Sequence, residues 1–78
     1  MNGVDMIRIL RSEHPEYDEL QKRMEVDHDF IGIEISSDEV KCLFENSRRN
    51  QTVPFSRYFS YYHQETAWVK KHFPEAFI

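Results

Sequence analysis

The sequence predicts a mostly α-helical fold, a small bundle of about four helices with one short extended segment at residues 29–35 that could pair as a strand. Two observations lead to this expectation. Apolar residues recur every three or four positions along most of the chain, as on one face of a helix. The chain is also only 78 residues long, without linker-like runs, so residues 1–78 are expected to form one small helical domain.

The first two helices are predicted on either side of a proline. Val4, Ile7 and Leu10 share one helical face and predict a helix over about residues 3–12. Pro15 disfavours a helical residue before it and is well accepted at a first helical position, so a second helix is expected to start there. The acidic residues after the proline and the basic residues that end the segment suit the helix dipole.

The extended segment follows this second helix. Residues 29–35 place apolar side chains at alternating positions and include three isoleucines, a pattern typical of a short strand. A strand needs partners for its backbone groups. The sequence leaves open whether this segment pairs with another segment, pairs with a second copy of the chain, or is only an extended connector.

A third helix is predicted from Ser36 to about Ser47. Ser36 is followed three positions later by Glu39, which is the spacing of a capping box at a helix start. The residues that this helix is expected to bury are Val40, Leu43 and Phe44.

The last helix is predicted after a polar loop at residues 46–52, with Thr52 as its cap and Pro54 in its first turn. With about 100° of rotation per residue, this helix has two marked stripes. The stripe expected to face the core is Phe55, Phe59, Tyr62, Thr66, Val69 and Phe73, with Tyr58 at its margin. The opposite stripe is Arg57, Tyr61, Gln64, Trp68 and Lys71.

This second stripe has two interpretations. Tyr61 and Trp68 either pack beneath other helices with their polar tips satisfied, or stay exposed as an anchor patch of the residue types that dominate interaction hot spots. In the second case, two arginines of the preceding loop support the patch. The predicted partner-binding residues are then Arg48, Arg49, Arg57, Tyr61, Gln64, Trp68 and Lys71.

Charge is distributed unevenly along the chain. The net charge is −4, but residues 1–39 hold eleven acids and four bases, whereas residues 40–78 hold six bases and three acids. One interpretation is that the two halves neutralise each other across the fold. The other is that the basic half faces an acidic partner or nucleic acid.

No catalytic or metal-binding pattern stands out. The four histidines and the single cysteine lack the spacings that bring ligands or a nucleophile and its base together, and two glycines cannot build a phosphate-binding loop. The expectation is therefore a protein that is not an enzyme and uses no cofactor and no metal. The residues considered for such sites are His14, His28, Cys42, His63 and His72.

These patterns predict a small, non-enzymatic protein-binding or regulatory module that acts through the aromatic and basic face of its last helix. The alternative is a nucleic-acid-binding regulator, similar to a helix-turn-helix, that uses the same residues plus Lys70. A homo-oligomer is a third possibility. The lone cysteine and the absence of a leader or a long apolar run predict a cytoplasmic protein without a membrane partner.

Overall fold

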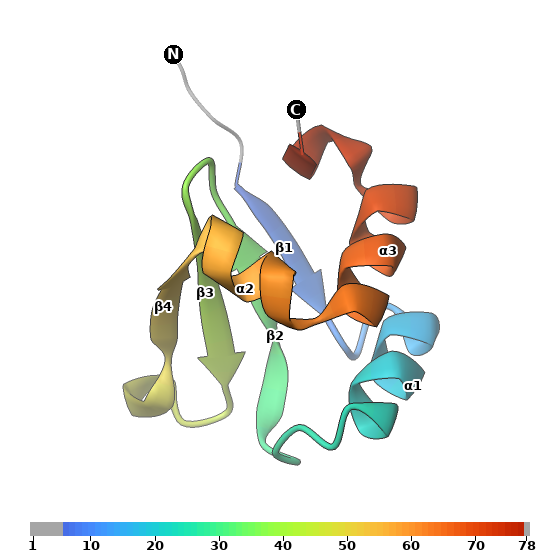
Figure 1. Ribbon diagram of the computed structural model, residues 1–78. Helices are drawn as coiled ribbons and strands as arrows, with labels where there is room; N and C mark the ends of the chain where they lie inside the picture. The colour runs from blue at the N-terminus through green and yellow to red at the C-terminus, as the bar shows by residue number, and fades with distance from the viewer. Residues whose placement is uncertain (1–5, 78) are drawn as a thin grey trace.

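A computed structural model describes residues 6–77, and these residues form an α/β fold (Figure 1). The expected mostly helical bundle is therefore wrong, and so is the description of the chain as a small helical protein. The elements are, in order, β1 (Ile7–Leu10), α1 (Pro15–Arg23), β2 (Phe30–Ile35), β3 (Glu39–Phe44), a 3-10 turn (Ser47–Arg49), β4 (Gln51–Pro54), α2 (Phe55–Tyr61), α3 (His63–His72) and a second 3-10 turn (Pro74–Phe77).

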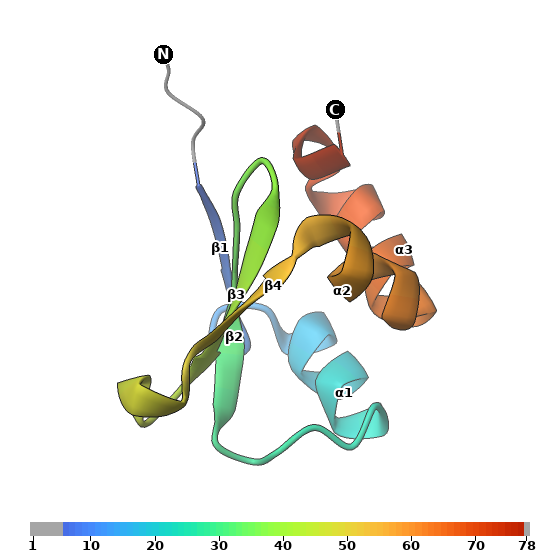
Figure 2. The same cartoon turned by 60° about the vertical axis from the view of Figure 1, so that its left-hand side comes forward.

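The four strands form one antiparallel sheet in the order β1-β2-β3-β4, so β1 and β4 are its edges. Figure 2, which views the sheet nearly edge-on, shows α1, α2 and α3 on one side of it. The fold therefore has two layers. One face of the sheet is covered by helices, and the other face has no helix against it in the described part of the chain.

The core lies between the sheet and the helices. Alternate strand residues point toward the helix layer, as the two-residue period of a strand requires, and the same register row joins Ile9, Ile33 and Cys42 across three strands. The fully or almost fully buried side chains of this core are Ile9, Tyr17, Phe30, Ile33, Ile35, Val40, Tyr58, Phe59 and Val69.

The opposite face of the sheet carries the ion pair of Arg8 and Glu34 and one glycine. The Arg8 guanidinium donates to the Glu34 carboxylate at 2.8 Å across β1 and β2. Gly32 pairs with Leu10, and a Cβ at this position would lie 2.2 Å from the carbonyl oxygen of Ile9. Only glycine therefore lets β1 come this close to β2.

The helix predicted over residues 3–12 is replaced by β1, as far as the described residues reach. Ile9 is buried and Ile7 is half-buried, while Arg8 between them points to the other face. A short apolar run fits both a helix and a strand, and here pairing with β2 decides for the strand. Residues 3–5 of the predicted helix lie outside the described residues.

The helix predicted from Ser36 to Ser47 is also wrong, because β2 and β3 form a hairpin there. The Ser36 N–H donates to the Glu39 carbonyl at 2.9 Å, which closes a tight turn over the two residues between them. The spacing that resembled a capping box is therefore a hairpin turn. The predicted extended segment is β2, and it pairs with strands of the same chain on both sides.

The predicted last helix is broken at Tyr62, where α2 ends and α3 begins. Tyr62 has φ −115° and ψ 85°, outside the helical region. The Thr66 hydroxyl, which has one proton to donate, lies 2.8 Å from the carbonyl oxygen of Phe59 and 2.7 Å from that of Tyr62. The Tyr62 carbonyl also accepts from the Thr66 N–H at 2.9 Å, so the hydroxyl is available as a donor for the Phe59 carbonyl at the break. The chain has neither proline nor glycine at this point to announce the break.

Candidate functional site

The seven residues predicted as one contact surface are dispersed in the structure. The break at Tyr62 changes the direction of the chain, so the residues before it and those after it no longer share a face. Two lie on α2, three lie on α3 and two lie in the first 3-10 turn. The α2 residues are Arg57 and Tyr61, the α3 residues are Gln64, Trp68 and Lys71, and the 3-10 turn holds Arg48 and Arg49.

Trp68 packs against α1. Its ring centroid lies 5.1 Å from that of Tyr17 and 5.7 Å from that of His14, and its indole nitrogen is buried. Gln64 and Trp68 line a shallow groove between α1 and α3. The Trp68 ring therefore packs between α1 and α3. Tyr61, in contrast, remains 75% exposed.

Arg49 is held by contacts within the protein. Its guanidinium donates to Asp27 at 2.9 Å and also to Asp29, and it lies over the ring of Phe44 at 4.6 Å. These contacts tie the 3-10 turn to the segment before β2. The neighbouring Arg48 is exposed, and in the described part of the chain its side chain forms no ion pair.

A hollow of about 500 Å³, here called the α2 hollow, lies between the sheet, α2 and the segment that follows α1. The elements that border it can be followed in Figure 1: α2, the chain after α1, and the strands β2, β3 and β4. Its floor, on the sheet, consists of Phe30, Cys42, Phe44, Gln51 and Val53. Its α2 rim consists of Arg57, Tyr58, Tyr61 and Tyr62, and its α1 rim consists of Met24, Glu25, Val26 and Asp27.

The two rims of the α2 hollow differ in charge. Arg57 on the α2 rim and Glu25 on the α1 rim take part in no ion pair among the described residues, whereas Asp27 is paired with Arg49. Glu25 has φ 58°, a left-handed conformation that costs a residue with a side chain about 1–2 kcal/mol. The hollow is therefore apolar and aromatic inside, with one free cation and one free anion on opposite rims.

Behind the hollow, a buried carboxylate joins the three helices. Glu65 of α3 is 0% exposed. Its Oε2 accepts hydrogen bonds from the Tyr17 hydroxyl at 2.5 Å, from Gln21 Nε2 at 3.0 Å and from the Tyr58 hydroxyl at 3.1 Å. Burial raises the pKa of Glu65, and these three donors act in the opposite direction.

The tyrosines and the cysteine around Glu65 also have raised pKa values, which favour their neutral forms. Burial is the largest cause that raises the pKa of Tyr17 and of Tyr58. Burial likewise raises the pKa of the Cys42 thiol to about 11. Cys42 is therefore a protonated thiol near neutral pH, which makes it a poor nucleophile and a poor metal ligand.

Sequence reasoning missed Glu65, although a signal was present. Tyr58, Tyr62 and Val69 lie seven and three residues before Glu65 and four residues after it, so the helical period places the acid beside apolar positions. An acid on the buried side of a helix needs nearby donors. In this protein two of the three donors lie on α1. The residue pattern of the last helical region alone cannot reveal donors on another helix.

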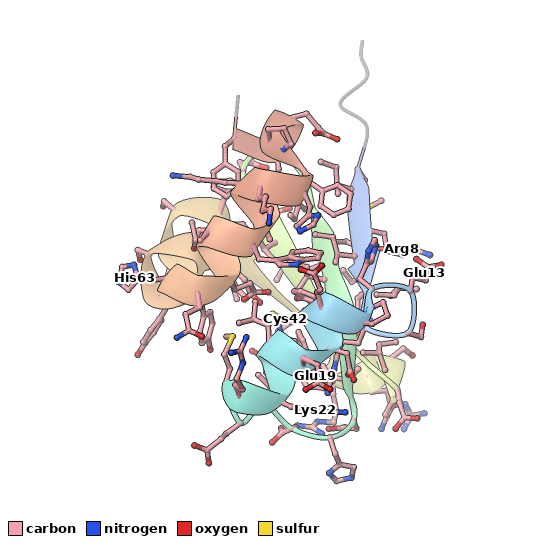
Figure 3. All side chains as sticks on the ribbon, turned by 90° about the vertical axis from the view of Figure 1, so that its right-hand side faces the viewer. Arg8, Glu13, Glu19, Lys22, Cys42 and His63 are labelled. Atoms are coloured by element: carbon pink, nitrogen blue, oxygen red, sulfur yellow. The ribbon has the colours of Figure 1, made fainter. Side chains whose placement is uncertain are left out.

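The remaining chemistry-bearing residues do not gather. Figure 3 shows Cys42 between the helices and the sheet, whereas His63 points away from the molecule. Within residues 6–77, no three His, Cys, Asp or Glu side chains lie close enough together to hold a metal ion. None of the described helices is both long enough and apolar enough to cross a membrane.

Comparison of the chain with models of protein families, with curated proteins and with solved structures finds no match.

Proposed function

We propose that this domain is a protein-binding module that holds a short segment of a partner protein in the α2 hollow. The segment places an apolar or aromatic side chain in the hollow, with an acidic residue against Arg57 and a basic residue toward Glu25. The observation that carries this proposal is an aromatic hollow of about 500 Å³ bordered by one free charge of each sign.

The interior of the hollow suits an apolar anchor. Phe30 and Phe44 provide its floor, and Tyr58, Tyr61 and Tyr62 provide one wall. Aromatic side chains bury a large area and are enriched at interaction hot spots, as is arginine. Tyr61 is 75% exposed on the rim and stacks on Tyr62 with 5.6 Å between the ring centroids, so its ring is accessible to a partner.

An extended segment is favoured because β4 is an edge strand. The Phe55 N–H donates to the Asp38 carbonyl at 2.9 Å, so the backbones of Val53 and Phe55 face β3. By the alternation of antiparallel pairing, the backbone N–H and C=O of Thr52 face outward. A partner segment can therefore add to β4 and direct alternate side chains toward the hollow.

The nucleic-acid alternative gains no particular support. A helix-turn-helix would need residues 36–47 to be helical, and Glu39–Phe44 is a strand. Arg49, one of the bases counted for phosphate contacts, is bound to Asp27 and Asp29.

Selection of random phage-displayed peptides on the immobilised domain tests the proposal. The expected consensus is an apolar or aromatic residue flanked by an acid on one side and a base on the other. Affinity is then measured by fluorescence polarisation with one selected peptide. Arg57→Glu and Tyr61→Ala are each expected to weaken binding about tenfold, or about 1.4 kcal/mol.

The matched control is Arg48→Glu, which makes the same charge change outside the hollow and is expected to leave affinity nearly unchanged. A peptide with its acid replaced by arginine is expected to regain affinity for the Arg57→Glu variant. The proposal is wrong if no consensus emerges, or if Arg48→Glu weakens binding as much as Arg57→Glu. Tight binding of an oligonucleotide that weakens steeply with salt and equally in both variants would support the nucleic-acid alternative instead.

A further inference from the structure

Two buried acceptors on neighbouring side chains have no donor among the described residues: Oε1 of Glu65 and Oε1 of Gln21. Both side chains are 0% exposed, so solvent does not reach them. The two groups are already in contact, because Gln21 Nε2 donates to the other oxygen of Glu65 at 3.0 Å. A buried acceptor without a donor destabilises the folded protein, so two of them on side chains that contact each other require an explanation.

We propose that Glu65 is held as the neutral acid in the folded protein and shares its proton with Gln21, which makes this contact between α1 and α3 a proton-binding site. The hydroxyl on Oε1 of Glu65 donates to Oε1 of Gln21. The amide of Gln21 donates in return to Oε2 of Glu65, which acts as the carbonyl oxygen of the acid. One proton thereby satisfies both orphaned acceptors. An ionised Glu65 would leave both of them unpaired.

The groups that face Glu65 are consistent with a neutral acid. They are Tyr17 from α1, Tyr58 from α2, Cys42 from β3 and Tyr62 from the break between α2 and α3. All four are uncharged near neutral pH. Among the described residues, no lysine, arginine or histidine forms an ion pair with Glu65. A buried carboxylate without a cation beside it is costly.

The proton links stability to pH in a defined direction. An acid whose pKa is higher in the folded protein than in the unfolded chain binds its proton more tightly when folded. The resulting stability is complete below the ordinary glutamate value of 4.5. It is lost as the pH rises through the raised pKa of Glu65. Since Glu65 joins α1, α2 and α3, this loss falls on the junction of all three helices.

The first test measures the proton directly on the intact, unmodified protein. The Cδ chemical shift of Glu65 is followed by ¹³C NMR during a pH titration. The expected midpoint lies above the ordinary value of 4.5. A midpoint at or below that value overturns the proposal, because Glu65 would then be ionised wherever an exposed glutamate is.

The second test compares two substitutions by thermal unfolding. Glu65→Gln mimics the neutral acid, because its amide N–H can donate to Gln21 while its carbonyl oxygen still accepts the three existing bonds. It is expected to match or exceed the melting temperature of the wild type, with an advantage that grows as the pH rises. Glu65→Asp keeps the ionisable group but shortens its reach, and a loss of melting temperature is expected. If Glu65→Gln is destabilised as strongly as Glu65→Asp, the charge is required and the proposal fails.

Neither test involves ligand binding. Their outcome is therefore independent of the function proposed for the α2 hollow.

Discussion

Tyr58 connects the surface of this protein to its buried acid: its ring lines the α2 hollow, and its hydroxyl donates to Oε2 of Glu65 at 3.1 Å. The two residues lie on different helices, α2 and α3, on either side of the break at Tyr62. Loss of the Tyr58 hydroxyl from the wall of the hollow would therefore remove a hydrogen bond at the junction of the helices.

Removing the Tyr58 hydroxyl tests this connection. Tyr58→Phe keeps the aromatic wall but takes one donor from Glu65, so a loss of about 1 kcal/mol in the free energy of unfolding is expected. Urea denaturation monitored by circular dichroism measures it. Tyr61→Phe is the matched control, because the Tyr61 side chain is 75% exposed and its hydroxyl has no protein partner in the described part of the chain. Equal losses in the two variants would contradict a specific role for Tyr58.

The left-handed backbone at Glu25 predicts a stabilising substitution. This residue follows α1 with φ 58°, a position at the end of helices where glycine is preferred. Glu25→Gly is expected to raise the free energy of unfolding by about 1 kcal/mol, since it removes the side-chain penalty. Glu25→Ala removes the charge but keeps the penalty, so it should bring no gain. A gain of the same size from alanine would show that charge, not conformation, is limiting.

Asp18 predicts a loss of stability in acid. A hydrogen bond from Lys22, with a further contribution from Arg11, lowers the pKa of Asp18 below its ordinary value of 3.8. An acid with a lowered pKa in the folded state contributes stability that is present above its unfolded value and is lost as the pH falls through the folded one. Asp18→Asn is therefore expected to flatten the acid side of the curve of melting temperature against pH. An unchanged acid side would mean that other carboxylates dominate it.

Cys42 is expected to resist alkylation. Burial raises the pKa of its thiol to about 11, so near pH 8 the reactive thiolate is far scarcer than in a free cysteine, whose pKa is about 8.5. Iodoacetamide labelling followed by mass spectrometry should be at least about tenfold slower in the native protein than in the same chain unfolded in urea. Equal rates in the two states would show that the thiol is neither shielded nor shifted.

Local chemistry was sufficient to predict some elements. Pro15 and the charge order after it predict α1, and the alternation of residues 29–35 predicts β2, because both patterns depend on neighbours in sequence. The apolar stripe of the last helical region also identifies buried residues, since Phe59 and Val69 lie in the core. The protein-binding residues predicted from the opposite stripe are still untested. They are dispersed in space, and only Arg57 and Tyr61 border the α2 hollow.

Tertiary structure decided what depends on distant partners. β1 and β3 have apolar spacings that suit a helix, and only their antiparallel pairing with β2 makes them strands. The break at Tyr62 has the Thr66 hydroxyl within hydrogen-bond distance of its carbonyls, and it separates Tyr61 from Trp68 without any proline or glycine. Glu65 is buried because α1 brings its donors from 44 and 48 residues away. Sequence by itself determined which segments have an apolar face, whereas the tertiary structure decided which faces pack together. The reason is that the free energy of burial and of strand pairing arises from contacts between segments and not from any single segment.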